Sequence, residues 1–135
     1  MDICSKLQSI EPQEGFYLLH TDNALIKLCF VTDEIVRIRA SFDKDLAEES
    51  YILLTTAWED RLDPLFAGER TRLTPVKAGL KETEDAVFFS TAEVTLRVDR
   101  DPLNFTLCDA DGNILYRALS GCPFVKDSNG RVIAY

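Results

Sequence analysis

Apolar and polar residues alternate with a period of two along most of the chain. The cleanest case places Val94, Leu96 and Val98 between Glu93, Thr95, Arg97 and Asp99. Successive side chains of a strand point to opposite faces, so this pattern predicts strands with one face toward a core and one toward water. We expect such strands over residues 16–20, 24–31, 34–40, 93–99 and 103–108.

Turn-forming residues separate these segments. They lie at 21–23 (Thr-Asp-Asn), 101–102 (Asp-Pro), 109–113 (Asp-Ala-Asp-Gly-Asn) and 127–130 (Asp-Ser-Asn-Gly). Glycine and asparagine tolerate the positive φ angles that tight hairpins require. Many short strands with turns about every 8–12 residues are typical of an antiparallel β-sandwich or barrel, so the predicted fold class is all-β.

The segment 43–63 breaks the alternation. It holds seven acidic and two basic residues around the apolar run 51–58 (Tyr-Ile-Leu-Leu-Thr-Thr-Ala-Trp). Periodicity leaves a helix or a strand open for this run, and its threonine pair and flanking aromatic residues favour a strand. Segment 61–77, with Pro64 and Pro75, is expected to be an irregular connection.

Length and charge narrow the class of protein. The chain has 135 residues, which predicts one domain over residues 1–135. Its formal net charge of −8 argues against nucleic acid and anionic membranes as partners. No apolar run reaches the roughly 20 residues of a membrane-spanning helix. The N-terminus shows no basic stretch followed by an apolar one, so we expect a cytoplasmic location.

The sequence offers no recognisable catalytic or metal-binding set. His20 is the only histidine, so any triad must use it, and we expect it to be a surface residue at the end of a hairpin strand. The four cysteines, Cys4, Cys29, Cys108 and Cys122, form no CxxC pair and are expected to be structural thiols. We therefore expect no catalytic residue, no metal ligand and no cofactor.

Aromatic and acidic residues offer candidates for a sugar-binding rim. Phe42, Tyr51, Trp58 and Asp60 lie in or beside the acidic segment. Aromatic faces and carboxylates are the groups that bind sugar rings and hydroxyls. The favoured reading for Tyr51 and Trp58 alone is core, because tryptophan is usually highly buried. The tripeptide Asn104-Phe105-Thr106 matches a glycosylation acceptor, without a visible route to the secretory pathway.

Several motifs together resemble a known domain. Residues 34–40 (Glu-Ile-Val-Arg-Ile-Arg-Ala) form a hydrophobic–Arg–hydrophobic–Arg strand, residues 96–105 combine a strand, a break at Asp101-Pro102 and a second strand, and residues 109–112 read Asp-Ala-Asp-Gly. Their order and spacing, with the segment 48–63, resemble the N-terminal domain of glycoside hydrolase family 31, the α-glucosidase and α-xylosidase family. The likeness covers residues 14–135, and Leu103 replaces the more usual phenylalanine.

The resemblance implies a β-sandwich of the galactose-mutarotase-like type, packed against a (β/α)8 barrel. In that family two barrel aspartates hydrolyse α-glycosides with retention. No residue here matches them, and a barrel needs about 250 residues. We therefore expect an N-terminal accessory domain that is inactive alone, with its own barrel and an α-linked oligosaccharide as partners.

The resemblance also implies that a loop of this domain reaches the rim of the sugar pocket, and Phe42, Tyr51, Trp58 and Asp60 are its candidates. Separated from its barrel, the domain is expected to self-associate through exposed apolar surface. The alternative hypothesis is a stand-alone carbohydrate-binding or self-associating β-sandwich module.

Overall fold

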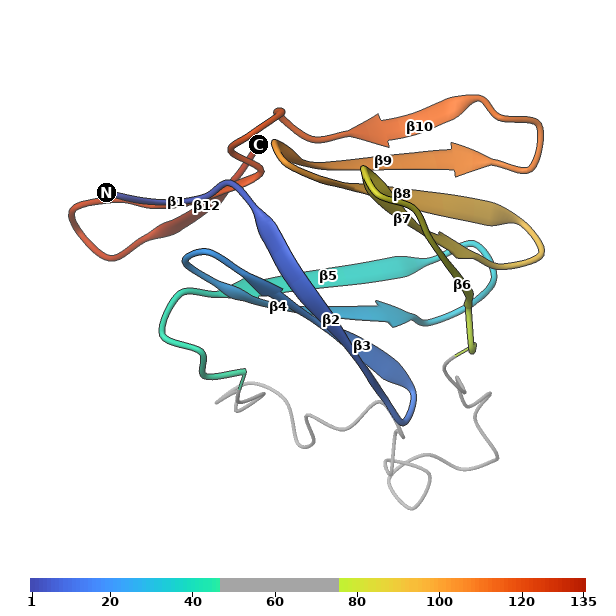
Figure 1. The fold of residues 1–135 in the computed structure, drawn as a ribbon, viewed down its shortest axis with the longest axis horizontal. Coiled ribbons are helices and arrows are strands. Elements are labelled where there is room, and N and C mark those ends of the chain that lie inside the picture. The colour runs from blue at the N-terminus through green and yellow to red at the C-terminus, as the bar shows by residue number, and fades with distance from the viewer. Residues whose placement is uncertain (47–75) are drawn as a thin grey trace, which may run out of the picture.

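The computed structural model describes residues 1–46 and 76–135, and in these residues all regular structure is β. Figure 1 shows two layers of strands, with a third, smaller group of strands projecting from one end. The strands are β1 (Asp2–Cys4), β2 (Leu7–Gln13), β3 (Phe16–Thr21), β4 (Leu25–Phe30), β5 (Val36–Ser41), β6 (Gly79–Glu82), β7 (Ala86–Ser90), β8 (Val94–Arg100), β9 (Leu103–Asp109), β10 (Ile114–Arg117), β11 (Phe124–Lys126) and β12 (Val132–Ala134).

Three antiparallel sheets make up the fold. The four-stranded sheet has the order β2-β3-β4-β5, the five-stranded sheet β10-β9-β8-β7-β6, and the three-stranded sheet β1-β11-β12. The first two face each other in Figure 1, and both chain termini lie toward the end where the third sheet projects. The structure is therefore an antiparallel β-sandwich, as the alternation predicted.

The core lies between the four- and five-stranded sheets. Phe89 of β7 occupies its centre, fully buried, with its ring centroid 4.9 Å from that of Tyr17 and 6.3 Å from that of Phe30, both in the opposite sheet. The Tyr17 hydroxyl donates a 2.8 Å hydrogen bond to the Ala78 carbonyl, which satisfies its polar end inside the core. Phe105 extends the core toward the third sheet, where its ring meets that of Phe124 at 6.0 Å.

Most of the predicted strands and turns are present. The expected segments coincide with β3, β4, β5, β8 and β9, and the four expected turns separate strands. In β8 the apolar set Val94, Leu96 and Val98 is buried as predicted. The expected strand at 51–58 lies outside the described residues, as does nearly all of segment 61–77. At its end, Val76 pairs with Phe30 in an isolated antiparallel bridge.

The alternation gave no prediction for strands β1, β2, β6, β7, β10, β11 and β12. The sequence of β7, Ala-Val-Phe-Phe-Ser, is apolar on both faces, so it carries no period of two. It lies inside the five-stranded sheet, paired with β6 and β8, where such an unbroken apolar run is expected. Pro12 lies in β2, which is an edge strand and therefore tolerates the missing amide donor.

One part of the prediction is wrong. The polar residues of β9 were expected to face water, yet Asn104 and Thr106 are buried, at 9% and 7% exposure. Thr106 pairs with Arg97 of β8 on one side and with Arg117 of β10 on the other. Two long side chains therefore flank the short side chain of Thr106 on the outer face of the sheet.

The two faces of β7 predict different mutational effects. Phe89→Ala should lower the free energy of unfolding by about 3–5 kcal/mol, because it empties the centre of a close-packed core. Phe88→Ala, which truncates a half-buried ring on the outer face, should have less than half that effect. Urea denaturation followed by far-UV circular dichroism measures both. A larger effect at Phe88 would mean that the register of β7 is wrong.

Candidate functional site

The candidates for a sugar-pocket rim are only partly placed. Phe42 directly follows β5, and its half-buried ring packs against the core. Tyr51, Trp58 and Asp60 lie outside the described residues. The structure therefore does not bring the four together, and the rim assignment stays a prediction.

Within residues 1–46 and 76–135 no catalytic or metal-binding cluster is found. His20 lies in β3, where its Nε2 is 2.9 Å from a carboxylate oxygen of Glu11 on the neighbouring strand. Its side chain is partly exposed, as expected of a surface residue near a hairpin end. Among the described residues no three His, Cys, Asp or Glu side chains are grouped to hold a metal ion, and no helix could cross a membrane.

None of the four cysteines, all of which lie in the described residues, forms a disulfide bond, as predicted. Cys4 and Cys29 are buried, and Cys108 and Cys122 are half-buried. Burial raises the pKa of the Cys4 thiol to about 11, and its thiol donates a hydrogen bond to the Thr21 hydroxyl over 3.1 Å. Because the thiolate is the reactive form, Cys4 has a packing role and is a poor nucleophile near neutral pH.

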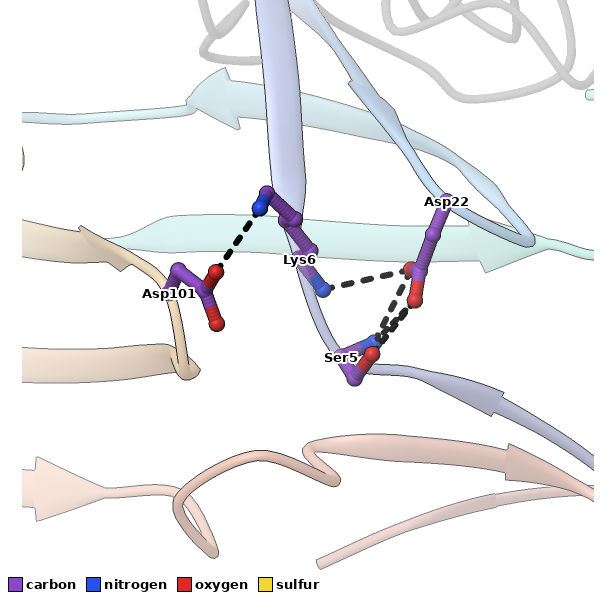
Figure 2. Close-up of polar contacts among 4 residues, drawn as sticks. All are labelled: Ser5, Lys6, Asp22 and Asp101. Atoms are coloured by element: carbon purple, nitrogen blue, oxygen red, sulfur yellow. Dashed lines mark hydrogen bonds and ion pairs between the residues drawn. The ribbon is translucent and has the colours of Figure 1, made fainter.

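A polar junction ties the three sheets together where β1 passes into β2 (Figure 2). One carboxylate oxygen of Asp22, in the β3–β4 turn, accepts hydrogen bonds from the backbone amides of Ser5 (2.9 Å) and Lys6 (3.2 Å), and the other accepts one from the Ser5 hydroxyl. The Lys6 ammonium lies 2.8 Å from Asp101, in the β8–β9 turn. The Ser5 carbonyl accepts a 2.7 Å bond from the amide of Leu103 in β9.

The charges at this junction are held in their ionised forms. Partial burial works to raise the pKa of Asp22, but the hydrogen bonds from Ser5 and Lys6 outweigh it, and the pKa lies below its ordinary value. The hydrogen bond and charge of Asp101 raise the pKa of Lys6. A carboxylate saturated by backbone donors is a poor proton acceptor, so the Asp22 cluster is structural and not catalytic.

Asp22→Ala should lower the free energy of unfolding by about 1 kcal/mol at neutral pH, because two backbone amides lose an ionised acceptor at a solvent-exposed site. The folded-state pKa is depressed, so this stabilisation is full above the ordinary value and is lost as pH falls through the folded-state value. The difference in the free energy of unfolding between wild type and the Asp22→Ala variant should therefore become smaller below about pH 4. Urea denaturation at several pH values measures it.

Asp111→Ala is the matched control, because Asp111 is an exposed turn residue whose side chain makes no hydrogen bond or ion pair in the described part of the chain. This substitution should change the free energy of unfolding by less than about 0.5 kcal/mol at every pH. If Asp22→Ala lowered the free energy of unfolding by the same amount down to strongly acidic pH, the role assigned to the charge of Asp22 would be contradicted.

The most extensive functional candidate is an apolar surface at the C-terminal end of the described chain. Seven of the ten exposed large apolar residues in the described ranges fall between residues 114 and 135. We define the C-terminal apolar surface as Leu115, Tyr116, Leu119, Ile133 and Tyr135, which are 39–58% exposed. Ile114 lies on the outer face of the five-stranded sheet, and Val132 points to the face of β12 opposite to that of Ile133.

Backbone irregularity and cross-links build this surface. A register shift between Ile114 and Tyr116 places Leu115 outside the regular pairing of β10 with β9. The carbonyl of Tyr135, the residue after β12, accepts hydrogen bonds from the Tyr116 hydroxyl (3.1 Å) and the Leu119 amide (3.2 Å). These bonds bring β10, its following turn and the end of β12 together. Clustered exposed apolar residues of this kind mark an interaction surface.

Comparison with solved structures finds the same fold inside much larger enzymes. The chain superposes on a family 31 glycoside hydrolase from Flavobacterium johnsoniae, a dextranase solved with glucose and, as a mutant, with isomaltotriose, with a TM-score of 0.71 and 18% identity over 95% of this chain. A Listeria monocytogenes protein solved with glucose, magnesium and calcium superposes with a TM-score of 0.62 and 13% identity over 87% of this chain. The cycloalternan-forming enzyme of the same organism, solved with a pentasaccharide substrate, superposes with a TM-score of 0.59 and 11% identity over 87% of this chain.

The share of each neighbour that is matched is small. The chain covers 14% of the dextranase and 9% of both Listeria proteins. No family model matches the chain, and no curated protein sequence matches it. The likeness therefore shows that this β-sandwich is a fold that also occurs as one part of these enzymes.

Proposed function

We propose that this chain is the N-terminal, non-catalytic domain of an α-glucosidase-like glycoside hydrolase and supports its catalytic barrel. The observation that carries the proposal is the match of nearly the whole chain to a small part of a family 31 dextranase. The rest of such an enzyme supplies the barrel and its two catalytic aspartates. Among the described residues, His20 pairs with Glu11, and Asp22 accepts hydrogen bonds from the backbone amides of Ser5 and Lys6.

The C-terminal apolar surface supports the same proposal. In a folded domain, exposed side chains such as Tyr116, Leu119 and Tyr135 gain stability only when a partner covers them. We assign this surface to the contact with the barrel. The substrate of the whole enzyme would be an α-linked glucose oligomer, and the segment from Phe42 to Asp63 is proposed to reach the rim of its pocket.

The experiment that tests this function is an activity assay on two proteins with a chromogenic α-glucoside. One is the 135-residue chain, and the other is the product of the native gene read beyond Tyr135. We expect hydrolysis only by the longer protein. Hydrolysis by the 135-residue chain alone would contradict the proposal, and so would a native reading frame that stops at Tyr135.

The isolated chain should associate at micromolar concentration, because no described residue covers its C-terminal apolar surface. Leu119→Glu should shift light scattering toward the 15.2 kDa monomer, since it places a charge in the middle of the contact. The free energy of unfolding should stay within about 0.5 kcal/mol of wild type because Leu119 is an exposed residue.

Ile35→Glu is the matched control for this experiment. Ile35 is as exposed as Leu119, at 53% against 54%, but lies in the β4–β5 turn, outside the C-terminal apolar surface. Its substitution should leave the association unchanged. Equal effects of the two variants would mean that the association is non-specific, and a wild-type chain that is already monomeric would contradict the prediction.

A further inference from the structure

The edges of the three sheets differ in how well they are protected against pairing with a further strand. An edge strand exposes backbone N–H and C=O groups, and proteins blunt such edges with charged residues, proline, bulges or a covering group. Most edges in the described part of the chain carry one of these features. They are Pro12 in β2, Arg37 and Arg39 in β5, Lys81 and Glu82 in β6, the register shift and Arg117 in β10, and, at β1, a 2.7 Å hydrogen bond from the Asn23 side chain to the Ile3 carbonyl.

The edge strand β12 carries none of these features. Its sequence is Val-Ile-Ala, all three residues are exposed, and its pairing with β11 shows no register shift. Valine and isoleucine favour extended structure. The three-stranded sheet projects from one end of the sandwich (Figure 1), so β12 lies at the border of a sheet that stands away from the core.

The hydrogen-bond pattern shows which backbone groups of β12 are open. The Arg131 carbonyl accepts a 2.9 Å bond from the Asp127 amide, and the Tyr135 amide donates at 3.1 Å to the residue before β11. Backbone groups point to alternate sides along a strand, so the amides and carbonyls of Val132 and Ala134 point away from β11. No described strand pairs with β12 on that side. The edge therefore offers two donors and two acceptors.

A second copy of β12 matches these four groups. In an antiparallel pair centred on Ile133, Val132 lies opposite Ala134 of the second copy, and each such pair exchanges two hydrogen bonds. All outward groups of both copies are then satisfied. A pair centred on Val132 would instead set Ala134 opposite Gly130, whose amide already donates within the β11–β12 turn. The register centred on Ile133 is therefore favoured.

The charges of the strand also fit a second copy in this register. Within residues 131–135 the sequence has one charged residue, Arg131. The pairing sets it opposite Tyr135 of the second copy and not opposite a second arginine. Arginine beside an aromatic ring is attractive, whereas like charges directly opposite each other destabilise a sheet. The strand is thus complementary to itself.

We propose that β12 pairs with β12 of a second copy of this chain, forming a six-stranded sheet with the order β1-β11-β12-β12-β11-β1. This inference goes beyond the proposed function and does not depend on a barrel. The two-fold axis is perpendicular to the joined sheet, so Ile133 and Tyr135 of both copies lie on one face of it. The pairing uses backbone groups in the plane of the sheet and leaves the face with these side chains for another contact.

The test is oxidative cross-linking of the 135-residue chain carrying Ile133→Cys. The Cα atoms of the two central residues should be about 4.5 Å apart, within the range that a disulfide spans. The matched control is Val132→Cys, whose two positions should be about 8–9 Å apart, beyond the limit of about 7 Å.

We expect a disulfide-linked dimer from Ile133→Cys, with the linkage between the two introduced thiols identified by mass spectrometry, and at least tenfold less from Val132→Cys. Wild type measures any background from the four native cysteines. Equal yields from the two variants, or a higher yield from Val132→Cys, would overturn the proposed register.

Ala134→Pro tests the backbone bonds themselves. It removes an outward amide that bonds to no described residue, so the thermal midpoint of the monomer should stay close to that of wild type. Two symmetry-related hydrogen bonds are lost from the dimer, so its dissociation constant should rise at least tenfold in analytical ultracentrifugation. Ala134→Val, which keeps the amide, should associate at least as tightly as wild type. Unchanged association of Ala134→Pro would overturn the proposal.

Amide hydrogen exchange of the wild-type chain keeps the test decisive should a variant fail to fold. Exchange at Val132 and Ala134 should slow as the protein concentration rises, while the Ile133 amide, which points to β11, should be protected throughout. Association without slower exchange at Val132 and Ala134 would show that the copies meet through side chains alone. That result would overturn the edge pairing and leave the contact with a barrel untouched.

Discussion

The opposite orientation of successive side chains in a strand is the constraint on which this structure depends. Each strand of the sandwich gives one face to the core around Phe89, and its other face must end in solvent, a ligand or a partner. The inner faces are satisfied within the chain. The outer face of the five-stranded sheet retains an unpartnered buried amide at Asn104, and the strands at the C-terminal end retain exposed apolar side chains. The proposed contact with a barrel follows from the apolar side chains that the fold leaves exposed.

Departures from regular pairing decide where these faces lie. Because of the register shift around Leu115, Ile114 and Arg117 lie on the outer face of the five-stranded sheet, and Tyr116 points to the opposite side of the sheet. The short edge strand β10 therefore contributes side chains both to the outer face of the sheet and to the C-terminal apolar surface. At the other end of the fold, the polar junction at Ser5 and Asp22 fixes where β1 leaves the sandwich and pairs with β11. The third sheet, and with it Tyr135, depends on that crossing.

The alternating pattern predicted the fold class and five strands because each of them has one polar and one apolar face. It gave no signal for β7, whose two faces are both apolar, or for the burial of Asn104 and Thr106 on the outer face of β9. Thr106 lies between Arg97 and Arg117 on the neighbouring strands, an arrangement that only the strand register reveals. The C-terminal apolar surface was expected only in general terms, since its residues come together through bonds to the Tyr135 carbonyl. The rim candidates at 51–60 stay predictions.

The central claim is that the C-terminal apolar surface is the contact with a catalytic barrel. Hydroxyl-radical footprinting of the 135-residue chain as a monomer and of the longer gene product tests it directly, because Tyr116 and Tyr135 are exposed aromatic rings and good reporters of solvent access. The account predicts that labelling of both tyrosines falls strongly in the longer protein, while labelling of exposed Met1 and Ile35 is unchanged. Equal labelling of Tyr116 and Tyr135 in the two proteins would contradict it.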